Sequence, residues 1–354
     1  MGVPSDILKG TNGADDKASW TERYNSQGPE WTAEGESELV QGNPFGLKPK
    51  RGGNVMTIVK ASGDDLVHSD GRTAEKAVEL IKKHREKPFF LAVGFVRPHV
   101  PFVAPEEYFN SYPYQQVILP PRVENDWDDI PTNGINYVTS VNGQMSVEQE
   151  KKAIAAYYAA VAYMDAQVGK VLKALKEEGL EDNTIVIFTS DHGFHLGEHR
   201  FWMKVSLHEE SVKVPLIIRV PGQEPSVCHS FTELLDLYPT ITELAGLQIP
   251  ESIQGKSLVG TLNNPKEEVR KTAFSVSVYH GSEAFLLRTE EWAFIQYEED
   301  AEEGKELYNM HVDPNQYNNL ADYPQYQDIV AHFQQKLKAK LTEVRTNDLA
   351  RTYQ

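Results

Sequence analysis

The run SDHGFHLGEH, from Ser190 to His199, brings one Asp, three His and one Glu together within ten positions. Asp191 offers a hard carboxylate oxygen and His192 an imidazole nitrogen, while Gly193 allows the backbone to approach a ligand closely. We interpret Asp191 and His192 as two ligands of a divalent cation. The alternative is that Asp191 caps a turn and that the histidines lie on a loop surface, because such tripeptides are short and common.

Further polar groups could act on a ligand beside such a cation. Arg97 and His99 follow the apolar run FFLAVGFV at residues 89–96, and Lys204 lies shortly after the histidine-rich run. A hard metal with a His and a Lys suits a tetrahedral oxyanion, because the metal polarises one oxygen while the cations hold the others. Phosphate esters and sulfate esters both fit this description.

Alternating helices and strands are predicted to position these residues. Residues 184–189 indicate a buried strand of a mostly parallel sheet, and Asp191 then falls at its carboxyl end, where open α/β sheets bind ligands. The other predicted elements are helices at 73–86, 146–178 and 233–246, strands at 89–96 and 214–220, short strands between 272 and 310, and a last helix at 326–344. This order predicts an α/β fold with a mainly parallel sheet flanked by helices, then a small C-terminal antiparallel sheet and helix.

Local signals place some boundaries along the chain. Ser146 and Gln149 predict a capping box at the start of the long helix, and Gly179 is a suitable stop. Asp165 is interpreted as a polar-face or capping carboxylate of this helix. Residues 100–146 read as a long loop. We predict an irregular segment at 1–60, a partial catalytic α/β domain at 61–264 and a C-terminal subdomain at 265–354.

Composition excludes several functions. The 354 residues carry a formal net charge of −17, which argues against nonspecific nucleic-acid binding. No apolar stretch is long enough for a membrane span, and the first residues lack the pattern of a signal peptide. The one cysteine, Cys228, excludes an intramolecular disulfide, and we interpret it as structural despite the neighbouring His229.

At this point the chain resembles a known family. The strings RPHVPF, YYAAVAYMDAQVGKVL, IVIFTSDHGFHLGEH, WMKVSLHEESVKVPLIIRVPG, LLDLYPTITELAGL and QGKSL look like the sulfatases of the alkaline phosphatase superfamily, most closely the iduronate-2-sulfatase type. The resemblance runs in order from about residue 70 to residue 320, and DDKASWTE at 15–22 is similar to a linker of the same type. Members of this family are typically exported, periplasmic or lysosomal.

The resemblance implies roles for individual residues. Asp191 and His192 match the second pair of ligands of the family's calcium ion, although many sulfatases have Asn in place of the His. Lys204 matches the lysine that holds the sulfate group, and His99 matches the histidine that donates a proton near the ester oxygen. For the neighbours we favour structural roles; these are His195, Glu198, His199 and Arg200.

The chain also departs from the family. Sulfatases use a formylglycine made from the Cys of a Cys-x-Pro/Ala-x-Arg motif, and this sequence contains no such motif, because Cys228 is followed by His229. The family's first strand with its paired Asp calcium ligands and its Gly-Lys-x-x-His stretch are also missing. The resemblance therefore implies a C-terminal portion of a sulfatase, possessing calcium ligands but no nucleophile, with an N-terminal sulfatase portion as a partner.

Three functions stay open on the sequence. The preferred one is hydrolysis of sulfate esters of sugars or glycosaminoglycans by the complete enzyme, with this chain inactive alone. The second is a phosphoester or phosphonate hydrolase of the same superfamily, which Lys204 and His99 make less favoured. The third is a noncatalytic remnant that binds sulfated glycans or a partner chain. We predict that His99, Asp191, His192 and Lys204 converge in one cleft at the carboxyl edge of the sheet.

Overall fold

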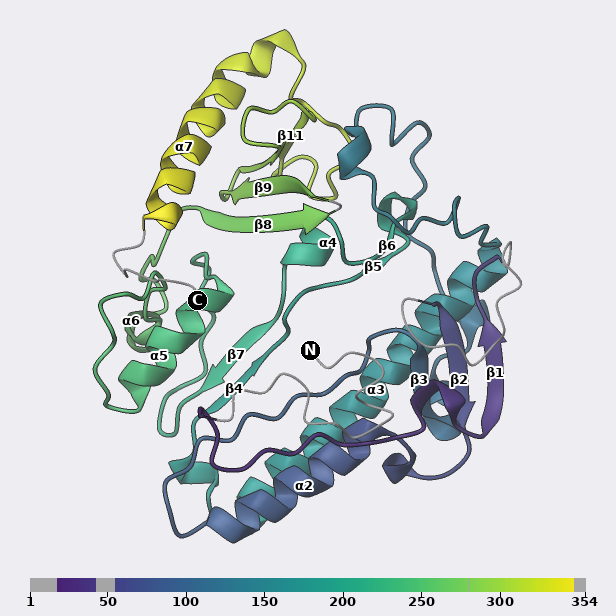
Figure 1. Cartoon of the computed structure of the whole chain (residues 1–354), viewed down its shortest axis with the longest axis vertical. Coiled ribbons are helices and arrows are strands. Elements are labelled where there is room, and N and C mark those ends of the chain that lie inside the picture. Colours follow the sequence, from purple (N-terminus) through teal and green to yellow (C-terminus); the bar gives the residue numbers. More distant parts are fainter. Residues whose placement is uncertain (1–17, 43–54, 280, 347–354) are drawn as a thin grey trace. The chain divides into compact units, whose positions relative to one another are not determined.

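A computed structural model of the chain describes residues 18–42, 55–279 and 281–346 (Figure 1). Asp15, Asp16 and Lys17 of the linker-like string lie outside these ranges. The chain divides into two compact units, each described by itself. The first unit comprises Met1–Pro121 and Val138–Ile185, and the second comprises Arg122–Tyr137 and Val186–Gln354.

The first unit contains a three-stranded sheet of β1 (Gly35–Leu39), β2 (Thr57–Ala61) and β3 (Phe102–Pro105). β1 pairs antiparallel with β2, and β2 pairs parallel with β3. The prediction of an irregular segment up to residue 60 was wrong at β1 and β2, and β3 interrupts the predicted long loop. Burial explains the difference, because Val59, Ala61 and Val103 form a small apolar core with Ala33, which outweighs the polar composition nearby.

Two helices, α2 (Ser69–His84) and α3 (Val147–Glu177), run side by side in this unit (Figure 1). The predicted capping box is confirmed: Ser146 Oγ accepts from Gln149 N, and Gln149 Oε1 accepts from Ser146 N. Gly179 follows the helix with a φ of +70°, as its prediction as a stop requires. Asp165 is exposed on α3, in keeping with a polar-face residue.

In the middle of the chain, the described residues form a smaller sheet than the sequence predicts. β4 (Val186–Thr189) and β7 (Leu216–Arg219) pair antiparallel as a two-stranded sheet, and residues 89–96 form no strand. Strands need neighbours for their backbone hydrogen bonds, and 89–96 has none among the described residues. In the described part of the chain, β2 and β3 of the first unit form the parallel pair.

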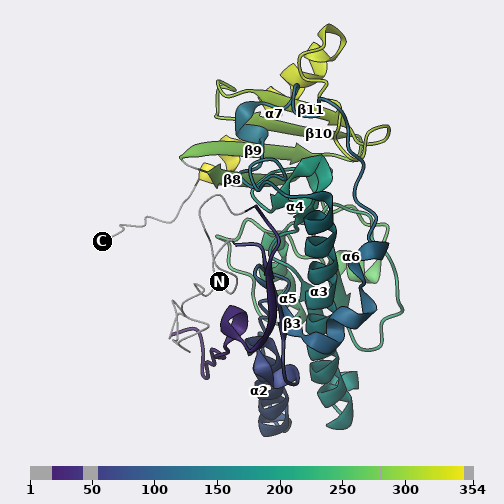
Figure 2. The ribbon, with the colours of Figure 1, turned by 90° about the vertical axis from the view of Figure 1, so that its right-hand side faces the viewer.

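The C-terminal part of the second unit forms the predicted antiparallel sheet and helix. The strands are β8 (Ala273–Tyr279), β9 (Ser282–Arg288), β10 (Trp292–Tyr297) and β11 (Lys305–Asn309), in the order β11-β10-β9-β8. α7 (Gln327–Arg345) packs on one face of this sheet, where Phe294 stacks on Phe333 (Figure 2). The α/β class and the C-terminal subdomain architecture are thereby confirmed.

Shorter elements complete the second unit. They are the β5 (His195–Leu196) and β6 (Trp202–Met203) hairpin, α4 (Glu209–Val212), α5 (Leu237–Leu244) and α6 (Val259–Asn263). The predicted helix at 233–246 is confirmed as a 3-10 turn at Leu234–Asp236 that continues into α5. Among the described residues, no helix combines the length and apolar character that a membrane span requires.

Candidate functional site

The Asp191–His192 pair follows β4 after one intervening residue, Ser190. His192 Nδ1 lies 2.8 Å from Gly193 O, which makes Nδ1–H the donor and assigns the lone pair of the neutral ring to Nε2. That Nε2 atom is buried without a hydrogen-bond partner among the described residues, and it lies 3.7 Å from Asp191 Oδ2. An orphaned imidazole nitrogen beside a carboxylate oxygen is the arrangement that a bound cation would satisfy.

The donor set fits calcium only in part. Calcium takes about six to eight ligands, mostly oxygen, and this pair offers one carboxylate and one imidazole. No group of three or more His, Cys, Asp or Glu side chains in the described ranges is arranged to hold a metal ion. Asp191 and His192 are therefore compatible with half of a cation site, and their assignment as ligands stays a prediction.

Gly193 is required by packing in the second unit. A Cβ atom at Gly193 would lie 2.0 Å from Glu210 O, and Gly193 N donates to Ser211 O at 2.8 Å. The close approach expected at this glycine is thus made to the backbone of α4. This contact fixes the end of the Asp191–His192 turn against the segment that follows Lys204.

Lys204 comes directly after β6, at the end of the hairpin. Its side chain is half-buried: burial lowers the pKa of Lys204, and the negative charge of Asp191 opposes that change. The interaction places the Asp191 carboxylate within electrostatic range of the ammonium group. The second unit therefore brings Asp191, His192 and Lys204 into one neighbourhood.

His99 belongs to the first unit, where Arg97 holds its backbone. Arg97 is only 4% exposed, and its Nη1 donates to His99 O at 2.7 Å and to Pro101 O. Its Nη2 forms an ion pair of 3.2 Å with Glu30 Oε2. His99 Nδ1 lies 2.5 Å from Val100 O, so proton transfer to a ligand would fall to Nε2. Because His99 and Asp191 lie in different units, their predicted convergence stays a prediction.

A second carboxylate supports the same turn from α2. Asp70 is buried and accepts hydrogen bonds from Val96 N and Arg97 N, both at 2.9 Å. Burial raises the pKa of Asp70, and the positive charge of Arg97 opposes the rise. Glu30 in turn accepts from Ser69 N at 2.7 Å. The Arg97 cluster, defined as Arg97, Glu30 and Asp70, thus fixes the backbone that carries His99.

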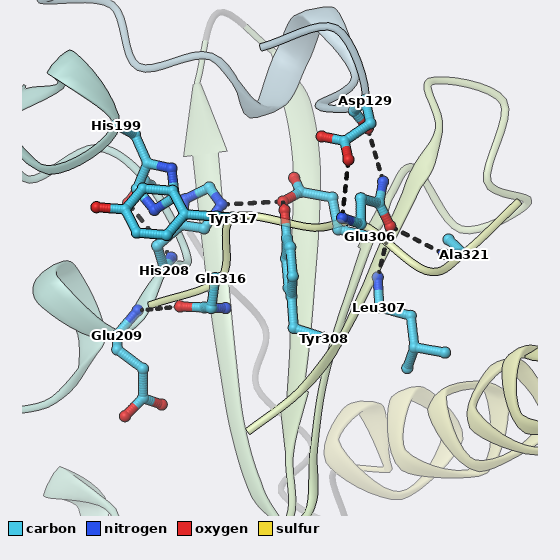
Figure 3. A network of polar contacts seen from close by, with 12 residues as sticks. Asp129, His199, His208, Glu209, Glu306, Leu307, Tyr308, Gln316, Tyr317 and Ala321 are labelled. Carbon is cyan, nitrogen blue, oxygen red and sulfur yellow. Dashed lines mark hydrogen bonds and ion pairs between the residues drawn. The ribbon is translucent and has the colours of Figure 1, made fainter. Parts of the chain in front are cut away.

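The histidines expected to be structural are buried in a polar network of the second unit (Figure 3). His199 Nδ1 pairs with Asp126 Oδ2 at 3.1 Å, and its ring stacks on His208 with 5.1 Å between centroids. His208 Nε2 pairs with Glu306 Oε2 at 2.9 Å. Structural roles are thereby supported for His195 and His199, whereas sequence reasoning overlooked His208 and Glu306. Their pairing across 98 positions leaves no local signal.

Cys228 shows no sign of a catalytic role in this arrangement. Its side chain is half-buried, and its Sγ atom makes only a weak contact of 4.0 Å with Glu267 O. Neither a carboxylate nor His229 is paired with it in the described residues. The interpretation of Cys228 as structural is compatible with this environment.

A family model described as Sulfatase matches residues 12–247, which is more than half of the chain. A second model, described as N-sulphoglucosamine sulphohydrolase, C-terminal, matches residues 197–345.

Two curated relatives illustrate the similarity. A protein named Sulfatase from Formosa agariphila is 34% identical over 264 residues, which cover 73% of this chain and 51% of the relative. Human iduronate 2-sulfatase is 34% identical over 222 residues, which cover 51% of this chain and 40% of the relative. The chain thus spans about half the length of the curated relatives it matches.

Solved structures show the same relation. A structure titled as a 2-O GAG sulfatase aligns with a TM-score of 0.67 and 28% identity, covering 82% of this chain and 66% of that chain. The phosphonate monoester hydrolase of Agrobacterium radiobacter aligns with a TM-score of 0.72 at 24% identity, covering 80% of this chain and 62% of that hydrolase. The latter likeness concerns the fold alone.

Proposed function

Because the chain belongs to the sulfatase family, we propose that it forms the C-terminal part of a hydrolase for sulfate esters of sugars or glycosaminoglycans. The observation that carries this proposal is the buried, unpartnered Nε2 of His192 beside Asp191, with Lys204 in electrostatic range. A cation and an ammonium group within electrostatic range of each other suit a sulfate anion.

The residues of this chain take distinct parts in the proposed reaction. Asp191 and His192 would hold one side of a calcium ion, which when bound would polarise a sulfate oxygen. Lys204 would bind a second sulfate oxygen and stabilise charge on the leaving oxygen. His99 would donate a proton to that oxygen from Nε2, with its Nδ1 held on Val100 O.

No residue of this sequence matches the nucleophile of the sulfatase family. The single cysteine is followed by His229, so the Cys-x-Pro/Ala-x-Arg motif is absent and no step can be derived through a formylglycine here. We propose that an N-terminal sulfatase portion supplies it, in one chain or as a partner. In support, one face of β7 is uncovered, with Ile217 61% exposed, although the apolar face of a strand is usually packed against another element.

The substrate class is proposed from the relatives. Human iduronate 2-sulfatase and the 2-O GAG sulfatase both carry names that refer to sulfated glycans. A sulfated uronate is therefore the first substrate to test. The competing proposal is a noncatalytic protein that binds sulfated glycans, and the missing nucleophile motif favours it for the chain alone.

The proposal is tested by complementation. The 354-residue chain would be assayed alone and together with an N-terminal sulfatase portion, using a sulfated aryl ester and a sulfated uronate disaccharide. We expect sulfate release only from the combination, and we expect a metal chelator to abolish it. Metal-dependent release by the chain alone would contradict the need for a second portion, and no release from a folded combination would favour the noncatalytic protein.

In the active combination, Lys204→Ala should lower kcat by about 100- to 1000-fold, because a cation facing the developing charge is lost. The matched control is Lys213→Ala, which removes an exposed lysine of the same segment. Cys228→Ser should leave the rate unchanged. Equal rates for the Lys204 and Lys213 variants would rule out the assigned role of Lys204.

A further inference from the structure

Glu306, on β11, is a fully buried carboxylate with three partners. It accepts hydrogen bonds from His208 Nε2 at 2.9 Å, from Tyr308 Oη at 2.5 Å and from Tyr297 Oη. Burial by itself would raise the pKa of Glu306, but the charge of His208 and the hydrogen bonds reverse the effect and lower it. Glu306 is therefore a fixed negative charge inside the second unit (Figure 3).

His208 connects Glu306 to the segment that carries Lys204. His208 N donates to Ser206 Oγ at 3.3 Å, and the same oxygen lies 2.8 Å from His195 Nε2 in β5. Ser206 Oγ also donates to Ser211 Oγ at 2.9 Å. The residues that follow Lys204 are thus bonded both to the hairpin that precedes it and to α4.

A second set of contacts fixes the tip of the hairpin. His199 is held between Asp126 and the ring of His208, and Trp127 Nε1 donates to His199 O at 2.7 Å. On the other side, the ring of Tyr317 lies over His199 with 4.8 Å between centroids (Figure 3). The tip of the hairpin and the end of the segment at His208 are therefore tied to the residues around the C-terminal sheet.

We propose that Glu306, acting through His208, is a positioning residue that sets the environment of the Lys204 ammonium group. Glu306 lies in the antiparallel C-terminal sheet, whereas Lys204 directly follows the hairpin, so the sheet would determine how this cation is presented to an anion. The importance of that presentation for turnover rests on the proposed sulfatase function. The positioning itself can be measured without turnover.

The test uses the whole 354-residue chain and the ionisation of Lys204. Lysines would be reductively methylated with carbon-13, and the Lys204 signal would be identified by its loss in Lys204→Arg. In Glu306→Gln we expect the pKa of Lys204, which burial now lowers, to move up toward the value of about 10.4 for a solvated lysine. The matched control is Glu290→Gln, which changes an exposed carboxyl before β10 and should leave the titration unaltered.

A milder variant covers the case in which Glu306→Gln does not fold. Tyr308→Phe keeps the carboxylate and removes one of its donors, so it should shift the Lys204 titration in the same direction by less. If either folded variant lowers the melting temperature but leaves the Lys204 titration at its wild-type position, Glu306 is only structural and the proposal is overturned. A shifted titration together with a fully active Lys204→Ala enzyme would instead contradict the sulfatase role of Lys204 alone.

Discussion

Each unit contains one buried charged cluster beside a residue of the proposed site, and the two clusters are built from different chemistry. In the first unit the Arg97 cluster holds the His99 turn with a guanidinium that stays charged at every accessible pH. In the second unit the His208–Glu306 pair anchors the Lys204 segment with an imidazole that pairs with a buried carboxylate and stacks on the ring of His199. The anchor of the first unit is therefore a permanent cation, whereas the anchor of the second is an imidazole ring paired with one carboxylate.

The largest loss of stability is expected from removing the permanent charge of Arg97. Arg97→Met would leave Glu30 and Asp70 buried without their cation, and breaking a buried ion pair costs about 3–5 kcal/mol. Urea unfolding followed by circular dichroism measures this loss. The control is Arg85→Met, which removes a half-exposed arginine of a surface pair with Glu178 and should change the midpoint little. Equal midpoints for the two variants would show that the Arg97 cluster does not stabilise the first unit.

A buried histidine gives the first unit its own sensitivity to acid. Burial lowers the pKa of His68 to about 4 from 6.5, and neither ring nitrogen has a hydrogen-bond partner among the described residues. The unfolded chain takes up a proton below pH 6.5 and the folded chain does not until about pH 4, so stability falls as the pH drops through this window. The full shift corresponds to about 3 kcal/mol.

Unfolding free energies of wild type and His68→Gln between pH 7 and 4 check this slope, because this range spans the interval between the two pKa values. In His68→Gln the part of the pH slope that is due to His68 should disappear. In His84→Gln, which changes a partly exposed histidine of α2, that part of the slope should remain. A slope that is the same in all three proteins would argue that His68 is protonated in the folded state.

The smallest effect of pH on stability is expected from His199, and its sign is opposite to that of His68. Burial would lower the pKa of His199, but the hydrogen bond and charge of Asp126 outweigh it and raise the pKa above 6.5. A raised pKa contributes stability that is fully present below pH 6.5 and is lost as the pH rises through the folded value. Asp126→Asn should lower the pKa of His199 in an NMR titration, and the exposed Asp128→Asn on the same turn should not.

The sequence by itself determined the elements whose signals are local. The capping box at Ser146, the stop at Gly179 and the amphipathic helix near the C-terminus were predicted because each depends on residues a few positions apart. The family was also apparent from consecutive strings, and the Asp191–His192 pair stood out because its two members are adjacent.

Tertiary structure decided whatever depends on residues far apart. The apolar run 89–96 has the composition of a strand, yet it forms none in the described structure because a strand exists only beside a partner. β1 was overlooked because its pairing with β2 fixes it, although its own sequence is polar. His208 and Glu306 look like ordinary surface residues in the sequence, and only the folding of the C-terminal sheet buries them as a pair, since desolvation and pairing are properties of the packed chain.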